Sequence, residues 1–333
     1  MVTVVSLHKL PTPVPYTEMT LISNDPTWLP FISMSVLLSY FAVVYFTVVV
    51  YDWVLTFGQE FELVWKQRWS FMTVLYICVR CMGLSYSVII VLWNLPFSIT
   101  DSVGLIVYFL SAWIPIVVNA MLGVIMMIRI YAMYGRPKKM LIFLLVVLLS
   151  STIASGVMTA MGNVGVSAEE LVLFGYHACL VEFDTNQKDL NNETMIPTII
   201  WEILAFILAV WVVIKHFNQL RQSRTGSTIT GDFFTVLIQS HAFYFAAFAI
   251  VACFSLGLLS TYITYSSSVG SAVYIGFFGI GQVLQMFVLG PRLILSIREY
   301  HAKLVAMSDE GISMMSIDFQ AGGDVEHSHS DQR

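Results

Sequence analysis

Seven long runs of apolar residues dominate the chain, and each is long enough to cross a lipid bilayer as a helix. A helix needs about 20 residues to cross a hydrocarbon core of about 30 Å. The sequence therefore predicts an all-α polytopic integral membrane protein, built as one bundle of seven transmembrane helices. The predicted spans are Leu29–Leu55, Phe71–Trp93, Val103–Tyr131, Met140–Met161, Ile196–His216, Phe233–Leu258 and Ser271–Leu289.

The composition supports this interpretation, because 57% of the residues are hydrophobic and 11% are charged. Soluble domains contain about 45–50% apolar and about 25% charged residues. No second folded domain is expected outside the spans. Residues 1–28 are predicted to form an extracytoplasmic segment, residues 29–289 the membrane domain, and residues 290–333 a cytoplasmic tail that is disordered from about residue 304.

Lysines and arginines fall almost entirely on one side of the predicted bundle. The other side holds only Lys9 and Lys188, and its loop 162–194 is acidic. Because positive residues stay in the cytoplasm, the N-terminus is predicted to lie outside and the C-terminus inside. The twelve basic residues on the cytoplasmic side are Lys66, Arg68, Arg129, Arg136, Lys138, Lys139, Lys215, Arg221, Arg224, Arg292, Arg298 and Lys303.

Arg80 is the clearest polar residue inside a predicted span. It lies nine residues from the cytoplasmic end of the second span, at a depth of about 14 Å for a rise of 1.5 Å per residue. Ionisable groups in a bilayer are costly, so its side chain is expected to face the bundle and to have a counter-charge. Asp52 and Glu202 are the two competing candidates.

Other spans contribute further polar side chains to the predicted interior. Two interpretations stay open: an interhelical brace, or a site linked to a ligand or ion. The candidate ligand-binding or polar-core residues are Asp52, Arg80, Asn119, Glu202, His241, Gln282 and Gln285.

The basic loops predict a second kind of contact. Their side chains could bind anionic lipid or a cytosolic signalling protein, or act as plain topology determinants. The candidates are Arg129, Arg136, Lys138, Lys139, Arg221 and Arg224. Glu60 and Glu62 belong to a short stretch of mixed charge and aromatic residues that suits the headgroup zone.

The sequence argues against catalysis. No predicted span has a lysine in its interior for a retinal Schiff base, and His241 alone among the histidines lies deep in a span. We therefore expect no enzyme activity, metal, cofactor or nucleic-acid partner. Of four cysteines, only Cys179 is predicted outside, which leaves it without an outer disulfide partner. Asn192 begins a possible glycosylation sequon close to the fifth span.

Motifs around the first two spans resemble a known family. They look like the N-terminal module of a fungal multi-pass membrane family with the domain of unknown function 6533. The resemblance implies a seven-span membrane protein and no activity, since that family has none established. The motifs are Tyr51-Asp52, Leu55-Thr56-Phe57, Glu60 with Glu62-Leu63-Val64-Trp65, Arg68-Trp69-Ser70 and Arg80, with similar blocks at 129–136 and 290–299.

The topology favours a receptor-like or sensor protein. A ligand would enter between the outer halves of the helices near Trp113, Trp201 and Glu202, and binding would shift helices around Arg80, His241 and Gln282. The alternatives are a transporter or channel that uses Arg80 and Glu202, or a non-catalytic scaffold. The plasma membrane is favoured over internal membranes.

Overall fold

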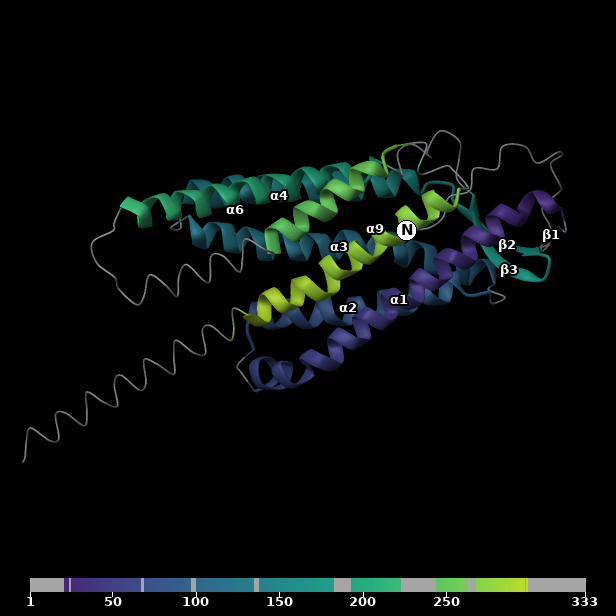
Figure 1. Cartoon of the computed structure of the whole chain (residues 1–333), viewed down its shortest axis with the longest axis horizontal. Coiled ribbons are helices and arrows are strands. Elements are labelled where there is room, and N and C mark those ends of the chain that lie inside the picture. The colour runs from purple at the N-terminus through teal and green to yellow at the C-terminus, as the bar shows by residue number, and fades with distance from the viewer. Residues whose placement is uncertain are drawn as a thin grey trace, which may run out of the picture.

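A computed structural model of the chain describes residues 21–23, 25–66, 69–96, 100–134, 138–182, 193–222, 244–260, 263, 268–296 and 298. It is mostly helical, and its long helices run along the longest axis of the molecule (Figure 1). The helices are α1 (Leu29–Glu60), α2 (Phe71–Asn94), α3 (Asp101–Met133), α4 (Lys138–Gly162), α6 (Ile196–Gln222) and α9 (Val269–Val283), with a further helix at Tyr244–Gly257.

Five helical segments in the described part of the chain are long and apolar enough to cross a membrane. They are Pro26–Trp65, Phe71–Asn94, Asp101–Tyr131, Lys138–Gly162 and Val269–Ser296. These segments coincide with the first four and the last of the predicted spans. The fifth predicted span lies in α6, whose apolar part is Ile196–Val212. The sixth is described only from residue 244, because residues 233–243 lie outside the described ranges.

The helices pack in chain order, and the last one returns to the first. α1 contacts α2 and α9, α2 contacts α3, and α3 contacts α4 and α6. α9 therefore crosses obliquely between the pair α1–α2 and the group α3–α4–α6 (Figure 1). One face of α4 stays exposed and apolar, as expected for a lipid-facing surface. It carries Ile142, Val146, Ile153 and Val157.

Two helices end in wide π-helical turns. α1 continues into the π-helix η2 (Phe61–Trp65), and α9 continues into the π-helix η3 (Leu284–Leu289), after which the chain stays helical to Ser296. We call the helix Val269–Ser296 the last helix. Such turns are rare and occur often at functional sites. Here η2 and η3 lie near the same end of the bundle, since Arg298 reaches the Leu63 carbonyl oxygen at 2.7 Å.

A small sheet covers the opposite end of the bundle (Figure 1). β1 (Leu21–Ser23) pairs in parallel with β2 (Ser167–Leu173), which pairs antiparallel with β3 (Tyr176–Glu182). Phe174 and Gly175 connect β2 to β3, both with positive φ, as two-residue hairpin turns require. The expectation of an all-α protein missed this sheet, whose strands β2 and β3 lie in the acidic loop 162–194 and whose strand β1 lies in the N-terminal segment.

Side-chain contacts attach the sheet to the start of α3. The backbone N–H of Glu170 donates to Asp101 Oδ1 over 3.1 Å. Tyr108 on α3 also donates to Asn163 Oδ1, just after the end of α4, over 2.6 Å. Cys179 packs so closely on Gly104 that a Cβ there would lie 2.6 Å from its sulfur. Burial, together with the carboxylates of Asp101 and Glu170, raises the pKa of the Cys179 thiol to about 11.

Candidate functional site

Arg80 is the centre of a buried charge cluster. Its Nη1 donates to Asp52 Oδ2 over 2.7 Å, and its Nε donates to Glu60 Oε1 over 2.9 Å. All three side chains are at most 7% exposed. Asp52 and Glu60 come from α1 and Arg80 from α2, so the ion pairs tie these two helices together. Of the two predicted counter-charges for Arg80, Asp52 is the one that pairs with it in the structure.

Glu60 is the member of this cluster that sequence reasoning missed. It was expected in the headgroup zone, but it is buried and accepts a hydrogen bond from the Tyr76 hydroxyl over 2.5 Å. Thr56, one turn earlier, also donates to Glu60 Oε1 and accepts from Arg80 Nη2. The spacing of Asp52, Thr56 and Glu60 puts three polar groups on one helix face, a signal present in the sequence.

The last helix closes the cluster. Arg292 Nε donates to Asp52 Oδ1 over 2.7 Å, and the Phe287 carbonyl oxygen in η3 accepts from Arg80 Nη1 over 3.3 Å. Two guanidinium groups therefore balance two carboxylates. Buried charges are tolerated when they are paired and hydrogen-bonded in this way. The cluster holds α1, α2 and the last helix in a fixed relative position.

Two further arginines donate to backbone carbonyl groups beside the cluster. Arg298 donates to Leu63 in η2, and Arg129 Nη2 donates to the Leu293 carbonyl oxygen over 2.9 Å. Arg129 was predicted to bind anionic lipid or a cytosolic protein, or to act as a topology determinant. In the described structure its side chain is buried between α3 and the last helix.

Glu202 forms a separate buried pair. It lies on α6 and accepts a hydrogen bond from Gln285 Nε2 in η3 over 2.5 Å. Both side chains are buried, and Trp201 beside Glu202 is buried as well. The predicted ligand entry comprised Trp113, Trp201 and Glu202, and in the described structure Trp201 and Glu202 are buried while Trp113 is exposed.

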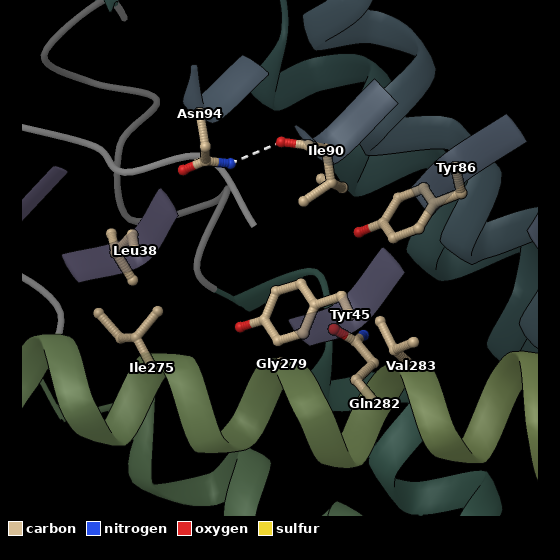
Figure 2. A pocket seen from close by; sticks show the side chains of 9 residues that line it. All are labelled: Leu38, Tyr45, Tyr86, Ile90, Asn94, Ile275, Gly279, Gln282 and Val283. Carbon is tan, nitrogen blue, oxygen red and sulfur yellow. Dashed lines mark hydrogen bonds between the residues drawn. The ribbon is translucent and has the colours of Figure 1, made fainter. Parts of the chain in front are cut away.

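A small pocket lies between α1, α2 and α9 (Figure 2). Its cavity volume is about 30 Å³. Tyr45, Tyr86, Asn94 and Gln282 bring polar groups to its lining, and Tyr45 also donates to the Gly276 carbonyl oxygen over 2.8 Å. Of these residues only Gln282 was predicted. The apolar part of the lining consists of Leu38, Ile90, Ile275, Gly279 and Val283.

The remaining predicted residues do not join these sites in the described structure. Asn119 is half-buried on α3, while Lys138 and Lys139 are exposed at the start of α4. Within the described ranges, no group of three or more His, Cys, Asp or Glu side chains could hold a metal ion. The predictions for Arg136, Asn192, Arg224 and His241, and for the Arg221 side chain, fall outside the described residues.

Comparison with known families adds one finding. Residues 40–85 match a family described as a family of unknown function, DUF6533. This segment contains the second half of α1, η2 and the first part of α2, and with them Asp52, Glu60, Tyr76 and Arg80. The part of the charge cluster supplied by α1 and α2 therefore lies within the matched module. No curated protein matches the chain.

Proposed function

We propose that this chain is a non-catalytic, receptor-like membrane protein of seven spans, with its N-terminus outside and its C-terminus in the cytoplasm. A small ligand would bind in the pocket between α1, α2 and α9. The last helix would carry the resulting shift to the charge cluster and the basic cytoplasmic face.

The observation that carries this proposal is that one helix contributes to both sites. Gly279 and Gln282 line the pocket, and Phe287 and Arg292 contact the charge cluster further along the same helix. Gln282 and Phe287 are five residues apart, about 7 Å along the axis. The π-helix η3 begins between them. A ligand that displaces Gln282 would therefore move the helix that holds Arg80 and Asp52 in place.

The pocket lining indicates the chemistry of the ligand. Among the described residues that line it, the polar groups are two hydroxyls and two amides, and none is a carboxylate or a basic side chain. Pockets of this kind orient a ligand with a few hydrogen bonds and bury its apolar part. We therefore propose a neutral small molecule with hydroxyl or carbonyl groups. Because the resting cavity has room for little more than water, binding would separate α1, α2 and α9.

The span number and orientation are supported by charge and helix length. α6 and the helix Tyr244–Gly257 stand at the fifth and sixth predicted spans. The strong asymmetry of lysine and arginine favours a cytoplasmic end near the charge cluster. Protease protection of epitope tags at the two termini in sealed vesicles tests this. Tags on opposite faces are expected, and tags on the same face would exclude an odd number of spans.

A labelling experiment tests the ligand proposal. The protein in nanodiscs would carry a single cysteine at the exposed position 62 (Glu62→Cys, with the native cysteines replaced by serine). Its thiol would report on the end of the bundle that holds the charge cluster. A panel of neutral hydroxylated and carbonyl-containing molecules should include one that changes the thiol labelling rate. Gln282→Leu should abolish that change, and Ser150→Ala on the exposed face of α4 should preserve it. A response that survives Gln282→Leu, or no response to the panel, would exclude this pocket as the receptor site.

A further inference from the structure

Glu202 is a buried carboxyl group with no ionic partner among the described residues. Its side chain lies in the apolar helix segment Ile196–Val212 and is 7% exposed. Its hydrogen-bond partner is the amide of Gln285. A carboxylate left alone inside a membrane protein carries a large desolvation penalty, so such a group is expected either to pair or to become neutral.

Gln285 gives the second observation. Its Nε2 donates to Glu202, but its Oε1 is buried and accepts no hydrogen bond in the described structure. Leaving a buried acceptor unsatisfied costs about 1–3 kcal/mol. An ionised carboxylate can only accept hydrogen bonds, whereas a protonated carboxylic acid has one O–H to donate. A proton on Glu202 would therefore supply the donor that Gln285 lacks.

We infer that Glu202 and Gln285 form a proton-binding site in which Glu202 is held as the neutral acid. The Glu202 O–H donates to Gln285 Oε1, while Gln285 Nε2 donates to the other carboxyl oxygen. The two side chains then form a closed pair with two hydrogen bonds and no net charge. The site is separate from the ligand pocket, and the inference stands whether or not the receptor proposal does.

The surroundings favour a proton over a metal cation. Hard cations take about six oxygen ligands, more than these two side chains provide. Within the described residues, no cation forms an ion pair with Glu202, since Arg129 donates to Leu293 and Arg292 pairs with Asp52. Among the described side chains, the other charged or titratable groups on α6, α3, α4, the helix Tyr244–Gly257 and the last helix are Asp101, Tyr108, Arg129, Tyr131, Lys138, Lys139, Lys215, Tyr244, Cys253, Tyr274 and Arg292.

The position of Gln285 links proton binding at Glu202 to the wide turn η3 of the last helix. Gln285 lies in η3, between the pocket residue Gln282 and the cluster residue Phe287. Loss of the proton would place an uncompensated negative charge against this turn. The folded protein then holds a proton that the unfolded chain releases, so its stability is expected to fall as the pH rises.

Infrared spectroscopy of the full chain in nanodiscs tests this inference. Wild-type protein at pH 7 should show the carbonyl stretch of a protonated carboxylic acid, shifted in D₂O, and Glu202→Gln should lack it. Glu170→Gln, on the sheet beside His177, is the matched control and should keep the band. In thermal unfolding, the midpoint temperature of the wild type should decrease as the pH is raised from 5 to 9. The midpoint temperature of Glu202→Gln should stay constant over this range.

Two results would overturn the inference. The first is a wild type without the band, or a band that persists in Glu202→Gln. The second is stabilisation at pH 9 by sodium chloride but not by choline chloride, lost in Glu202→Gln. That second outcome would assign the carboxylate to a monovalent cation instead. Neither result bears on the ligand response that depends on Gln282.

Discussion

The guanidinium group of Arg80 lies 2.7 Å from the carboxylate of Asp52, a residue 28 positions earlier in the chain. Both side chains are buried, and Glu60, Tyr76 and the Phe287 carbonyl oxygen complete their surroundings. Because the charges are paired and the donors are used, the arrangement is suited to bracing three helices. Among the described residues these contacts close the cluster, and this is the ground on which we propose a receptor-like role over a transporter.

Replacing Arg80 should destabilise the fold strongly. Arg80→Ala leaves two buried carboxylates facing each other with only Arg292 nearby, and breaking a buried pair costs about 3–5 kcal/mol. Unfolding in detergent micelles, followed by circular dichroism, would measure the loss. Arg292→Ala is the control, because its side chain is 44% exposed and should cost about 1 kcal/mol or less. Equal losses for the two variants would contradict the proposed burial of Arg80.

Glu60 and Glu62 should differ sharply despite their closeness in sequence. Glu60→Gln removes the charge that binds Arg80 and Tyr76, and hydrogen bonds to charged groups contribute about 1.5–3 kcal/mol. Glu62 is exposed, so Glu62→Gln should change stability by less than about 0.5 kcal/mol. The same unfolding assay compares them. A headgroup position for Glu60 would instead make both substitutions neutral.

Two glycines on α9 should resist substitution by alanine. A Cβ at Gly276 would lie 2.4 Å from the Phe41 ring, and one at Gly279 would lie 2.2 Å from the Tyr45 hydroxyl. Either change should push α1 away from α9 and cost about 1–3 kcal/mol. Gly156→Ala on α4 is the control, since nothing lies within 4 Å of its Cβ position. Thermal unfolding of the purified variants would rank them, and a destabilised Gly156→Ala alone would argue against this helix pairing.

The thiol of Cys179 should react slowly at neutral pH. Its pKa is raised to about 11 by burial and nearby carboxylates, and only the thiolate reacts with maleimides. Because the thiol stays protonated below that value, the labelling rate should rise about tenfold per pH unit between pH 7 and 10. A membrane-impermeant maleimide with mass spectrometry would measure the rate, and Cys179→Ser identifies the signal. Fast labelling that does not vary with pH would contradict the packing of Cys179 on Gly104.

The apolar helices could be predicted from the sequence because membrane spans leave a strong pattern. Five of the seven predicted spans coincide with described membrane-length helices, of which the first and the last extend ten and seven residues beyond the predicted ends. In the second span, Tyr76, Arg80, Gly83 and Ser87 are spaced as one helix face, and all four are buried. The periodicity of apolar and polar residues along a helix predicts which of its faces is buried.

The partners of the polar residues were harder to predict, because they depend on how helices are staggered. Glu202 was placed close to Arg80 by counting residues from predicted span ends, but it pairs with Gln285 in η3. Glu60 was missed because α1 was expected to end at Leu55, whereas it continues to Glu60. The sheet was missed because its strands have only three to seven residues and because the turn residues of its hairpin, Phe174 and Gly175, give a weak signal.

The wide turn η3 allows the last helix to contain one residue more than regular turns would hold. Each residue of an ordinary helix rotates the chain by about 100°. Deleting one residue within Leu284–Leu289 would convert the wide turn to a regular one and leave Arg292 facing Asp52, whereas a deletion in the regular turns would swing it away. In related chains, a gap of a single position within the wide turn would mark proteins that keep this contact on an unbroken α-helix.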